Sequence, residues 1–354
     1  MRLGIIGLPA CGKTTIFNAL TGEQLPTGEL IDRVEIHTAV ADVPDDRLMA
    51  LSRLYQPKKT THTKVTYTDI GGLKADAGRE GLPGQLVNQL EQVDGYLHVV
   101  RAFQDPNIPH PLDAIDPARD INMMQEELLL HDLVVVEKRL ERLAEARQKG
   151  GRDRAQIERD QELFEKFNQS LNQGQPLRML ELSIEERKAL GGFGLLSIKP
   201  VLVLVNLGEG QDLPAMDVDD DIAVLGLQGE LEMEIAQLPD DEMSEFLNEY
   251  GLEEPGRQRV LRSSYDVLNL QSFFTVGEDE VRAWKLAKGA TALEAAGTVH
   301  SDMARGFIRA EVIFWERLIA LGGLSEARAQ GELRLEGKDY RVQDGEVVHI
   351  RFNI

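Results

Sequence analysis

Short apolar runs recur along the first two thirds of the chain, and segments of helical character separate them. The runs lie at residues 2–7, 65–70, 95–103, 200–206 and 221–227. Because their apolar residues are largely continuous, the pattern predicts strands that are buried on both faces. Buried strands separated by helices favour an α/β fold with a mostly parallel sheet.

A long helical pattern separates the third run from the fourth. The segment from about 121 to 149 is helix-forming, and apolar residues recur in it at steps of four and three. These residues are Leu129, Leu133, Val136, Leu140 and Leu143. Gly150 and Gly151 then break the helix. A second charged segment follows, with apolar residues at compatible spacing: Ile157, Phe164, Phe167 and Leu171. The sequence predicts an antiparallel helical hairpin whose two arms these side chains join.

The pattern of predicted strands and helices changes after about residue 272. A strand-like start is followed by a helical segment and a further strand, up to about residue 313. Near the end, Asp344-Gly345 lies between alternating apolar residues, which predicts a closing β-hairpin. The last stretch, about 80 residues long, is predicted to be a separate α+β module.

Composition limits the classes of function. The chain has 354 residues, with 39 Lys and Arg against 60 Asp and Glu, and its net charge is −21. This balance excludes a generally basic nucleic-acid binder, so we expect no DNA partner and only local RNA contact. The single cysteine, Cys11, excludes an intrachain disulfide and favours the cytoplasm. The absence of a long apolar stretch or a signal peptide predicts no membrane association.

A glycine-rich motif follows the first predicted strand. Residues 7–14 fit G-x-x-x-x-G-K-[ST] at the start of a predicted helix. The backbone N–H groups of such a loop face phosphate oxygens, Lys13 adds a charge for the β and γ phosphates, and Thr14 is a ligand for Mg²⁺. A plain glycine turn would give no reason for Lys and Thr at these positions. The predicted nucleotide contacts are Gly7, Pro9, Ala10, Cys11, Gly12, Lys13, Thr14 and Thr15.

An acidic motif follows the second predicted strand. Asp69 occupies the position that holds Mg²⁺ through water in P-loop proteins, and Gly72 can donate its N–H to the γ-phosphate. The next residue, Leu73, stands where Ras-type GTPases have a glutamine that orients the attacking water. Either hydrolysis is slow or another group positions the water.

The base-recognition motif is expected after the run at 200–206. Asn206-Leu207-Gly208-Glu209 stands where a guanine-specific GTPase carries N-K-x-D. Glu209 is one methylene longer than aspartate, and Leu207 lacks the lysine stem that covers the base. Guanine selectivity should therefore be weak, and adenine becomes a candidate base. The alternative is that Glu209 is only a surface carboxylate after a strand.

These motifs, with several longer stretches, resemble the YchF family, the Obg-like ATPases among the translation-factor-related P-loop GTPases. The resemblance covers nearly the whole chain. Its segments are 7–15, 69–73, 98–110, 206–209, 251–256, 268–284, 289–313 and 336–347.

The resemblance implies a G domain at 1–118 and 192–271, an inserted helical coiled-coil arm at 119–191, and a β-grasp (TGS) domain at 272–354. It also implies binding of ATP, with GTP as an alternative, slow Mg²⁺-dependent hydrolysis, and association with a ribosome or a ribosomal subunit. The family has an apolar residue at the position that Leu73 occupies here. The resemblance also implies a role for His110 in water activation. The alternative for His110 is an ordinary loop histidine.

This chain departs from the family in three places. Ala10-Cys11 replaces the usual Asn-Val. Arg33 aligns with the Mg²⁺-binding threonine of switch I, and Gln228-Gly229 replaces the usual base-contacting stretch. Two other functions therefore stay open: a GTP-specific Obg-type GTPase, and a nucleotide-gated binding module with little turnover.

The helix N-terminus should lower the pKa of the Cys11 thiol, which would make it sensitive to oxidation, unless Cys11 contributes only its backbone N–H.

Overall fold

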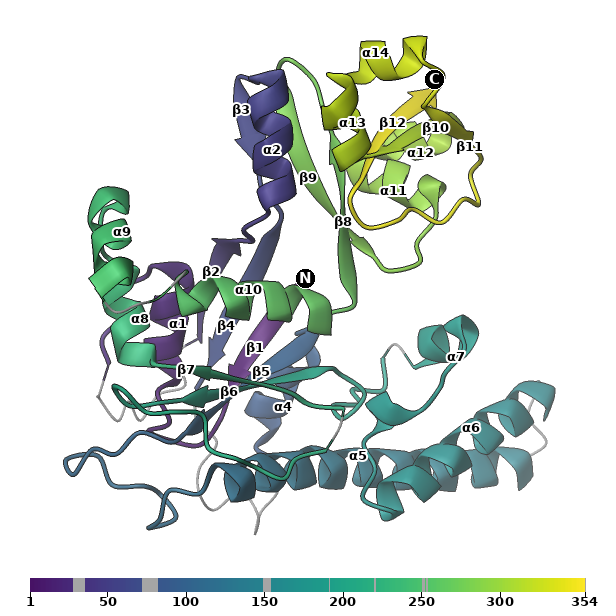
Figure 1. The fold of residues 1–354 in the computed structure, drawn as a ribbon. Coiled ribbons are helices and arrows are strands. Elements are labelled where there is room, and N and C mark those ends of the chain that lie inside the picture. Colours follow the sequence, from purple (N-terminus) through teal and green to yellow (C-terminus); the bar gives the residue numbers. More distant parts are fainter. Residues whose placement is uncertain are drawn as a thin grey trace. The chain divides into compact units, whose positions relative to one another are not determined.

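The computed structural model describes residues 1–27, 36–71, 82–148, 154–190, 192–219, 221–249, 252 and 254–353. The chain forms two compact units, and each combines segments that are distant in sequence. The first unit holds residues 1–39 and 66–257, and the second holds residues 40–65 and 258–354. Figure 1 follows the chain through both units by colour.

A six-stranded sheet in the order β2-β4-β1-β5-β6-β7 forms the centre of the first unit. The strands are β1 (Arg2–Ile6), β2 (Ile36–Asp42), β4 (Lys64–Ile70), β5 (Gly95–Arg101), β6 (Val201–Asn206) and β7 (Ala223–Leu227). β1 pairs in parallel with β4 and β5, and β6 continues the parallel pairing from β5 to β7. The five predicted strands and the α/β class are confirmed, whereas β2 was not predicted.

Both faces of this sheet are covered, which explains the continuous apolar runs. Every residue of β5 and β6 is buried. On one face, α4 (Gly84–Glu91) and the start of α5 (Pro117–Gln148) pack over Tyr96 and Val100. Two other helices, α1 (Lys13–Thr21) and α8 (Gly229–Ile235), lie side by side.

The segment between β5 and β6 contains the predicted helical pair. α6 (Arg154–Asn172) runs back along α5, as Figure 1 shows. Val136 of α5 packs with Phe164 and Phe167 of α6. The other predicted seam residues are buried or partly buried: Leu129, Leu133, Leu140, Leu143, Ile157 and Leu171. The seam prediction is confirmed, and its side chains form the contact between the two helices.

Asp132 joins α5 to the chain that returns toward β6. Its carboxylate is fully buried and accepts hydrogen bonds from the backbone N–H groups of Leu196 at 2.7 Å and Ser197 at 2.8 Å. The Ser197 hydroxyl donates a third, at 2.7 Å. Two backbone donors that would otherwise be buried without partners are thereby satisfied.

The second unit is built on a mixed sheet in the order β11-β10-β12-β8-β9-β3. The strands are β3 (Lys59–Thr61), β8 (Leu270–Thr275), β9 (Glu280–Ala287), β10 (Phe307–Phe314), β11 (Arg334–Glu336) and β12 (Glu346–Phe352). One core cluster includes α11 (Ala292–Val299), and another includes α2 (Asp46–Tyr55), α13 (Trp315–Leu321) and α14 (Leu324–Ala329). A short helix, α12 (Ser301–Arg305), follows α11.

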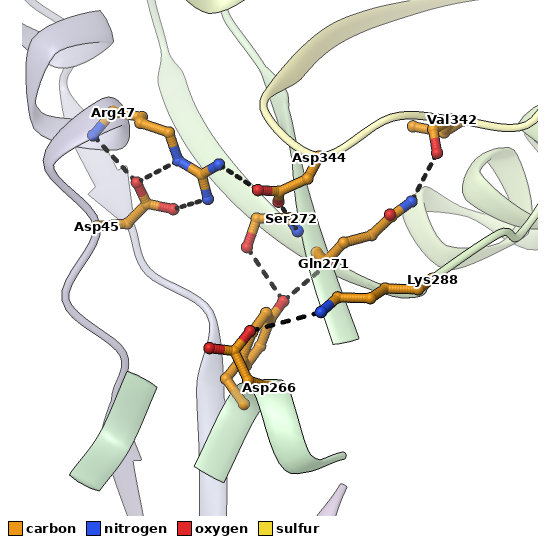
Figure 2. Close-up of polar contacts among 9 residues, drawn as sticks. Asp45, Arg47, Asp266, Gln271, Ser272, Lys288, Val342 and Asp344 are labelled. Atoms are coloured by element: carbon orange, nitrogen blue, oxygen red, sulfur yellow. Dashed lines mark hydrogen bonds and ion pairs between the residues drawn. The ribbon is translucent and has the colours of Figure 1, made fainter. Parts of the chain in front are cut away.

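The predicted closing β-hairpin is wrong. β12 pairs with β10 and β8, and β11 pairs with β10, so the two strands nearest the Asp344-Gly345 turn are not neighbours. The turn is fixed by other contacts, drawn in Figure 2: Asp344 accepts from Ser272 N at 2.9 Å and from Arg47 Nη1 at 2.6 Å. Gly345 also donates its N–H to Ser272 O. These contacts direct the turn to β8.

Residues 40–65 belong to the second unit, although they lie early in the sequence. Leu48 and Leu51 of α2 are fully buried in the same core cluster as Phe274. Asp45 binds Arg47 through both carboxylate oxygens, each at 2.9 Å, and Arg47 also reaches Asp344 (Figure 2). The division of the chain into two compact units does not test the predicted G domain, helical arm and TGS domain, so their boundaries stay a prediction.

The other helices are η1 (Leu177–Met179), α7 (Ile184–Ala189), α9 (Asp240–Glu249) and α10 (Gly256–Val267). Over the ranges that the structure describes, no helix combines the length and the apolar character needed to cross a membrane.

Candidate nucleotide-binding site

The phosphate loop, residues 7–14, connects β1 to α1. A Cβ on Gly7 would collide with the carbonyl oxygen of Val99, and a Cβ on Gly12 would collide with Nδ2 of Asn206. Gly12 also has φ +92°, a conformation that favours glycine. The two glycines of the motif are therefore required by the packing of the loop against β5 and β6.

Lys13, Thr14 and Thr15 form the first turn of α1, and all three are half-buried. Lys13 Nζ donates to the carbonyl oxygens of Gly7 at 3.1 Å and Leu8 at 2.9 Å, so the ammonium group lies against its own loop. The positive end of the α1 dipole lies at the same place. Charge and geometry therefore suit a polyphosphate. Pro9 and Ala10 lie in the same loop, half-buried.

The two predicted metal ligands lie next to each other. Thr14 Oγ1 donates to Asp69 Oδ2 at 2.9 Å, although 55 residues separate them in sequence. Asp69 is 5 % exposed, and its Oδ1 has no hydrogen-bond partner among the described residues. Burial raises the pKa of Asp69, while the hydrogen bond from Thr14 and the charge of Lys13 oppose this change. One buried carboxylate oxygen is thus available for a further ligand.

Asn206 connects the phosphate loop to the N-terminus of α8. Its Nδ2 donates to Cys11 O at 3.1 Å, and its Oδ1 accepts from Gly229 N at 3.1 Å. Gln228 occupies the N-cap position of α8, directly before Gly229, and its side chain makes no capping hydrogen bond. Both ends of the Asn206 amide are therefore occupied by backbone groups, and the side chain sets the spacing between two predicted contact segments.

Gly208 of the base motif lies beside Phe103, an aromatic residue that sequence reasoning missed. The Phe103 ring lies 3.9 Å from the position of a Cβ on Gly12, and Phe103 Cβ lies 3.7 Å from that of a Cβ on Gly208. Leu207 is half-buried and Glu209 is exposed. Phe103 belongs to an apolar run, but only the register of β5 with β6 places its ring between the phosphate loop and the base motif.

Gln211 was also missed. Its Oε1 accepts from Gly208 N at 2.9 Å, and its Nε2 donates to Ala102 O at 3.3 Å. The side chain therefore joins the base motif to the end of β5. A glutamine in a polar loop carries no pattern that predicts such a contact.

His110 is buried in the loop between β5 and α5. Its Nε2 lies 3.0 Å from Asp120 Oδ2, and its Nδ1 accepts from Leu112 N at 3.1 Å. Arg119 binds the other oxygen of Asp120 at 2.7 Å. Because Nδ1 is an acceptor, Nε2 carries the proton that Asp120 accepts. In this conformation neither ring nitrogen is free to take a proton from water.

Three sequence predictions lie outside the described residues. They concern Gly72 as a γ-phosphate contact, Leu73 at the water-positioning site, and Arg33 in switch I. They stay predictions.

The expected lowering of the Cys11 pKa is wrong. The side chain is 2 % exposed, and burial raises the pKa of the thiol more than the charge of Lys13 lowers it. Desolvation disfavours the thiolate and outweighs the nearby positive charge.

Cys11 is accordingly expected to react slowly. An aromatic disulfide reagent should label the folded protein at least about tenfold more slowly than the denatured chain, because the thiolate is the nucleophile and the folded thiol is buried. The absorbance of the released thiol measures both rates. Equal rates would mean that the phosphate loop opens readily.

The fold and the site together define the class of protein to which the first unit belongs. A loop of this motif between a buried parallel strand and a helix, with Thr14 beside Asp69, is the arrangement of P-loop GTPase domains. The family profile described as "50S ribosome-binding GTPase" matches residues 2–138. A second profile, YchF-GTPase_C, described as "Protein of unknown function (DUF933)", matches residues 270–353.

Full-length relatives narrow the class to one family. The "Ribosome-binding ATPase YchF" of Bacillus subtilis is 38 % identical over 367 residues, covering 100 % of both chains. That of Pasteurella multocida is 40 % identical over 363 residues, covering 100 % of this chain and 99 % of the relative. The solved structure of the Schizosaccharomyces pombe YchF GTPase matches with a TM-score of 0.83 and 28 % identity, over 99 % of this chain and 97 % of that one. The chain belongs to the YchF family.

Proposed function

We propose that the protein is a cytoplasmic P-loop nucleotide hydrolase that binds ATP with Mg²⁺, hydrolyses it slowly and associates with the ribosome. The observation that carries the proposal is the contact of Thr14 with Asp69, 2.9 Å apart at the first turn of α1. A phosphate loop needs such a hydroxyl and carboxylate beside it to bind a metal-nucleotide complex.

The residues present fit Mg²⁺. This ion takes oxygen ligands and is usually held by one or two protein groups together with substrate phosphates and water. Thr14 Oγ1 and the unpartnered Asp69 Oδ1 supply oxygens of that kind. When bound, Mg²⁺ would neutralise charge on the phosphates. Thr14 would contact it directly, Asp69 would hold it through water, and Lys13 would supply the second positive charge.

ATP is the proposed substrate because of the base motif. Glu209 is exposed at the end of the loop that Gln211 fixes, so its carboxylate is accessible to the edge of a base. Leu207 and Phe103 supply apolar surface for either purine. Competition calorimetry with ATP and GTP tests the preference: tighter binding of GTP would instead support a GTP-specific Obg-type GTPase.

The variant Glu209→Asp is expected to shift the ratio of ATP to GTP affinity toward GTP, by about tenfold. The shorter carboxylate suits the paired donors of guanine. The two dissociation constants, measured by calorimetry, check this expectation. The exposed Glu249→Asp serves as the matched control, and an unchanged ratio in Glu209→Asp would remove Glu209 from the base site.

Ribosome association is proposed from the names of the relatives and is compatible with the charge distribution. The net charge of −21 is concentrated in the first unit, because the second unit holds 18 Lys and Arg against 17 Asp and Glu. Any contact with RNA would therefore use local basic residues, and no DNA or membrane partner is proposed. Co-sedimentation with ribosomes, with and without ATP, tests the association.

The proposed domains are those predicted from the sequence: a G domain at 1–118 and 192–271, a helical arm at 119–191 and a TGS domain at 272–354. Within the G domain, the proposed nucleotide contacts are those predicted from the phosphate loop together with Gly72, Asn206, Leu207, Glu209, Gln228 and Gly229.

A nucleotide-gated binding module with little turnover is the second candidate. It is favoured by His110, whose two ring nitrogens are engaged by Leu112 and Asp120. Activation of water by His110 would require this segment to rearrange. Single-turnover hydrolysis with and without ribosomes separates the candidates, since tight ATP binding without phosphate release in either case would support the binding module.

A further inference from the structure

Arg101, the last residue of β5, is a buried cation that pairs with no carboxylate in the described part of the chain. It is 2 % exposed. Its Nε donates to Phe103 O at 3.1 Å and its Nη2 to Asp105 O at 3.4 Å, while Nη1 has no partner among the described residues. Fully buried arginines are rare unless they are paired. The cost of burying this charge calls for a physical explanation.

The guanidinium holds Phe103 in two ways. Besides the hydrogen bond to the Phe103 carbonyl, the guanidinium carbon lies 4.4 Å from the centre of the Phe103 ring. A cation at this distance attracts the ring face, and the attraction is stronger away from water. Arg101 therefore fixes both the backbone and the ring of Phe103.

The same ring stands between two predicted nucleotide-binding segments. The ring lies close to Gly12 of the phosphate loop, and the Cβ and Cα atoms of Phe103 lie close to Gly208 of the base motif. Asn206 O accepts from the N–H groups of Ala102 at 2.9 Å and Phe103 at 3.1 Å. The end of β5 is thus attached to the base motif through its backbone, and Arg101 adds the side-chain attachment.

We infer that Arg101 is a positioning residue for the base of the bound nucleotide. It acts through Phe103, which it holds as a preformed apolar wall beside the base motif. This inference rests on the proposed function. A wall that is already fixed spares the bound complex the entropy of ordering it, so purine nucleotides bind more tightly. The phosphate contacts lie in the loop and on α1, so a ligand without a base gains nothing from Arg101.

The test compares ATP with inorganic triphosphate, both measured by calorimetry with Mg²⁺. Arg101→Met keeps an unbranched apolar chain and removes the guanidinium. This variant is expected to weaken ATP binding about tenfold, while inorganic triphosphate changes by less than about twofold. Arg101→Lys keeps the charge but lacks the planar guanidinium, so its ATP affinity should lie between those of the wild type and Arg101→Met. Arg282→Met is the matched control, because Arg282 lies 3.9 Å from the Trp284 ring in the second unit.

A double-mutant cycle separates positioning from general damage. If Arg101 acts through Phe103, the Arg101→Met change should weaken ATP binding less than about twofold when Phe103 is already alanine. Equal losses for ATP and triphosphate, full additivity with Phe103→Ala, or unchanged ATP affinity in Arg101→Met would each overturn the inference. A wild-type protein that binds no ATP would instead overturn the proposed function.

Discussion

Replacing Lys13 with alanine is expected to weaken ATP binding by about a hundredfold or more. Lys13 Nζ is held by Gly7 O and Leu8 O, so the ammonium is already oriented within the phosphate loop. Its removal leaves backbone N–H groups and the α1 dipole as the only proposed phosphate contacts of the loop. Calorimetric titration with Mg²⁺ and ATP measures the loss.

The control is Lys138→Ala, which removes an exposed lysine from α5 in the same unit. It should bind ATP like the wild type, and thermal melting should show both variants folded. Wild-type ATP affinity in Lys13→Ala would mean that residues 7–14 do not bind the triphosphate.

Replacing Asp132 with alanine is expected to lower the free energy of unfolding by about 3 kcal/mol or more. The fully buried carboxylate accepts from Leu196 N, Ser197 N and the Ser197 hydroxyl, all within 2.8 Å. Its loss leaves two buried backbone donors without partners, together with a cavity. Urea unfolding, followed by circular dichroism, measures the change.

Two further variants define what Asp132 contributes. Glu158→Ala removes a carboxylate from a solvent-accessible pair on α6 and should leave the urea midpoint unchanged. Asp132→Asn keeps one acceptor oxygen, so its free energy of unfolding should lie between those of the wild type and Asp132→Ala. An Asp132→Ala variant as stable as the wild type would show that the 196–197 segment finds other hydrogen-bond partners.

Local patterns predicted most of the first unit. The apolar runs became β1, β4, β5, β6 and β7, and the two central strands β5 and β6 are the ones buried at every position, because both of their faces are covered. The steps of four and three from Leu129 to Leu143 became the contact between α5 and α6. The phosphate-loop motif placed Lys13 and Thr14 at a helix start, since its glycines permit the left-handed turn that leads into the helix.

Predictions failed where a distant segment supplied the partner. Asp344-Gly345 has the composition of a hairpin turn, yet Ser272 and Arg47 bind it and direct it to β8. Residues 43–63 lie between β2 and β4 of the first sheet, yet α2 buries Leu48 and Leu51 in the second unit. For Cys11, position at a helix start indicated a reactive thiol, but the protein packed around it raises its pKa.

The sequence by itself determined five strands of the first sheet, the helical pair, the family and the residue types of the candidate site, because these follow from local periodicity and short motifs. Only the tertiary structure decided which of these residues meet. Thr14 and Asp69 are 55 residues apart, Asp132 and Ser197 are 65 apart, and Asn206 reaches back 195 residues to Cys11. The physical reason is that a buried polar group takes whichever donor or acceptor the packing of strands and helices brings within about 3 Å, which no local pattern specifies.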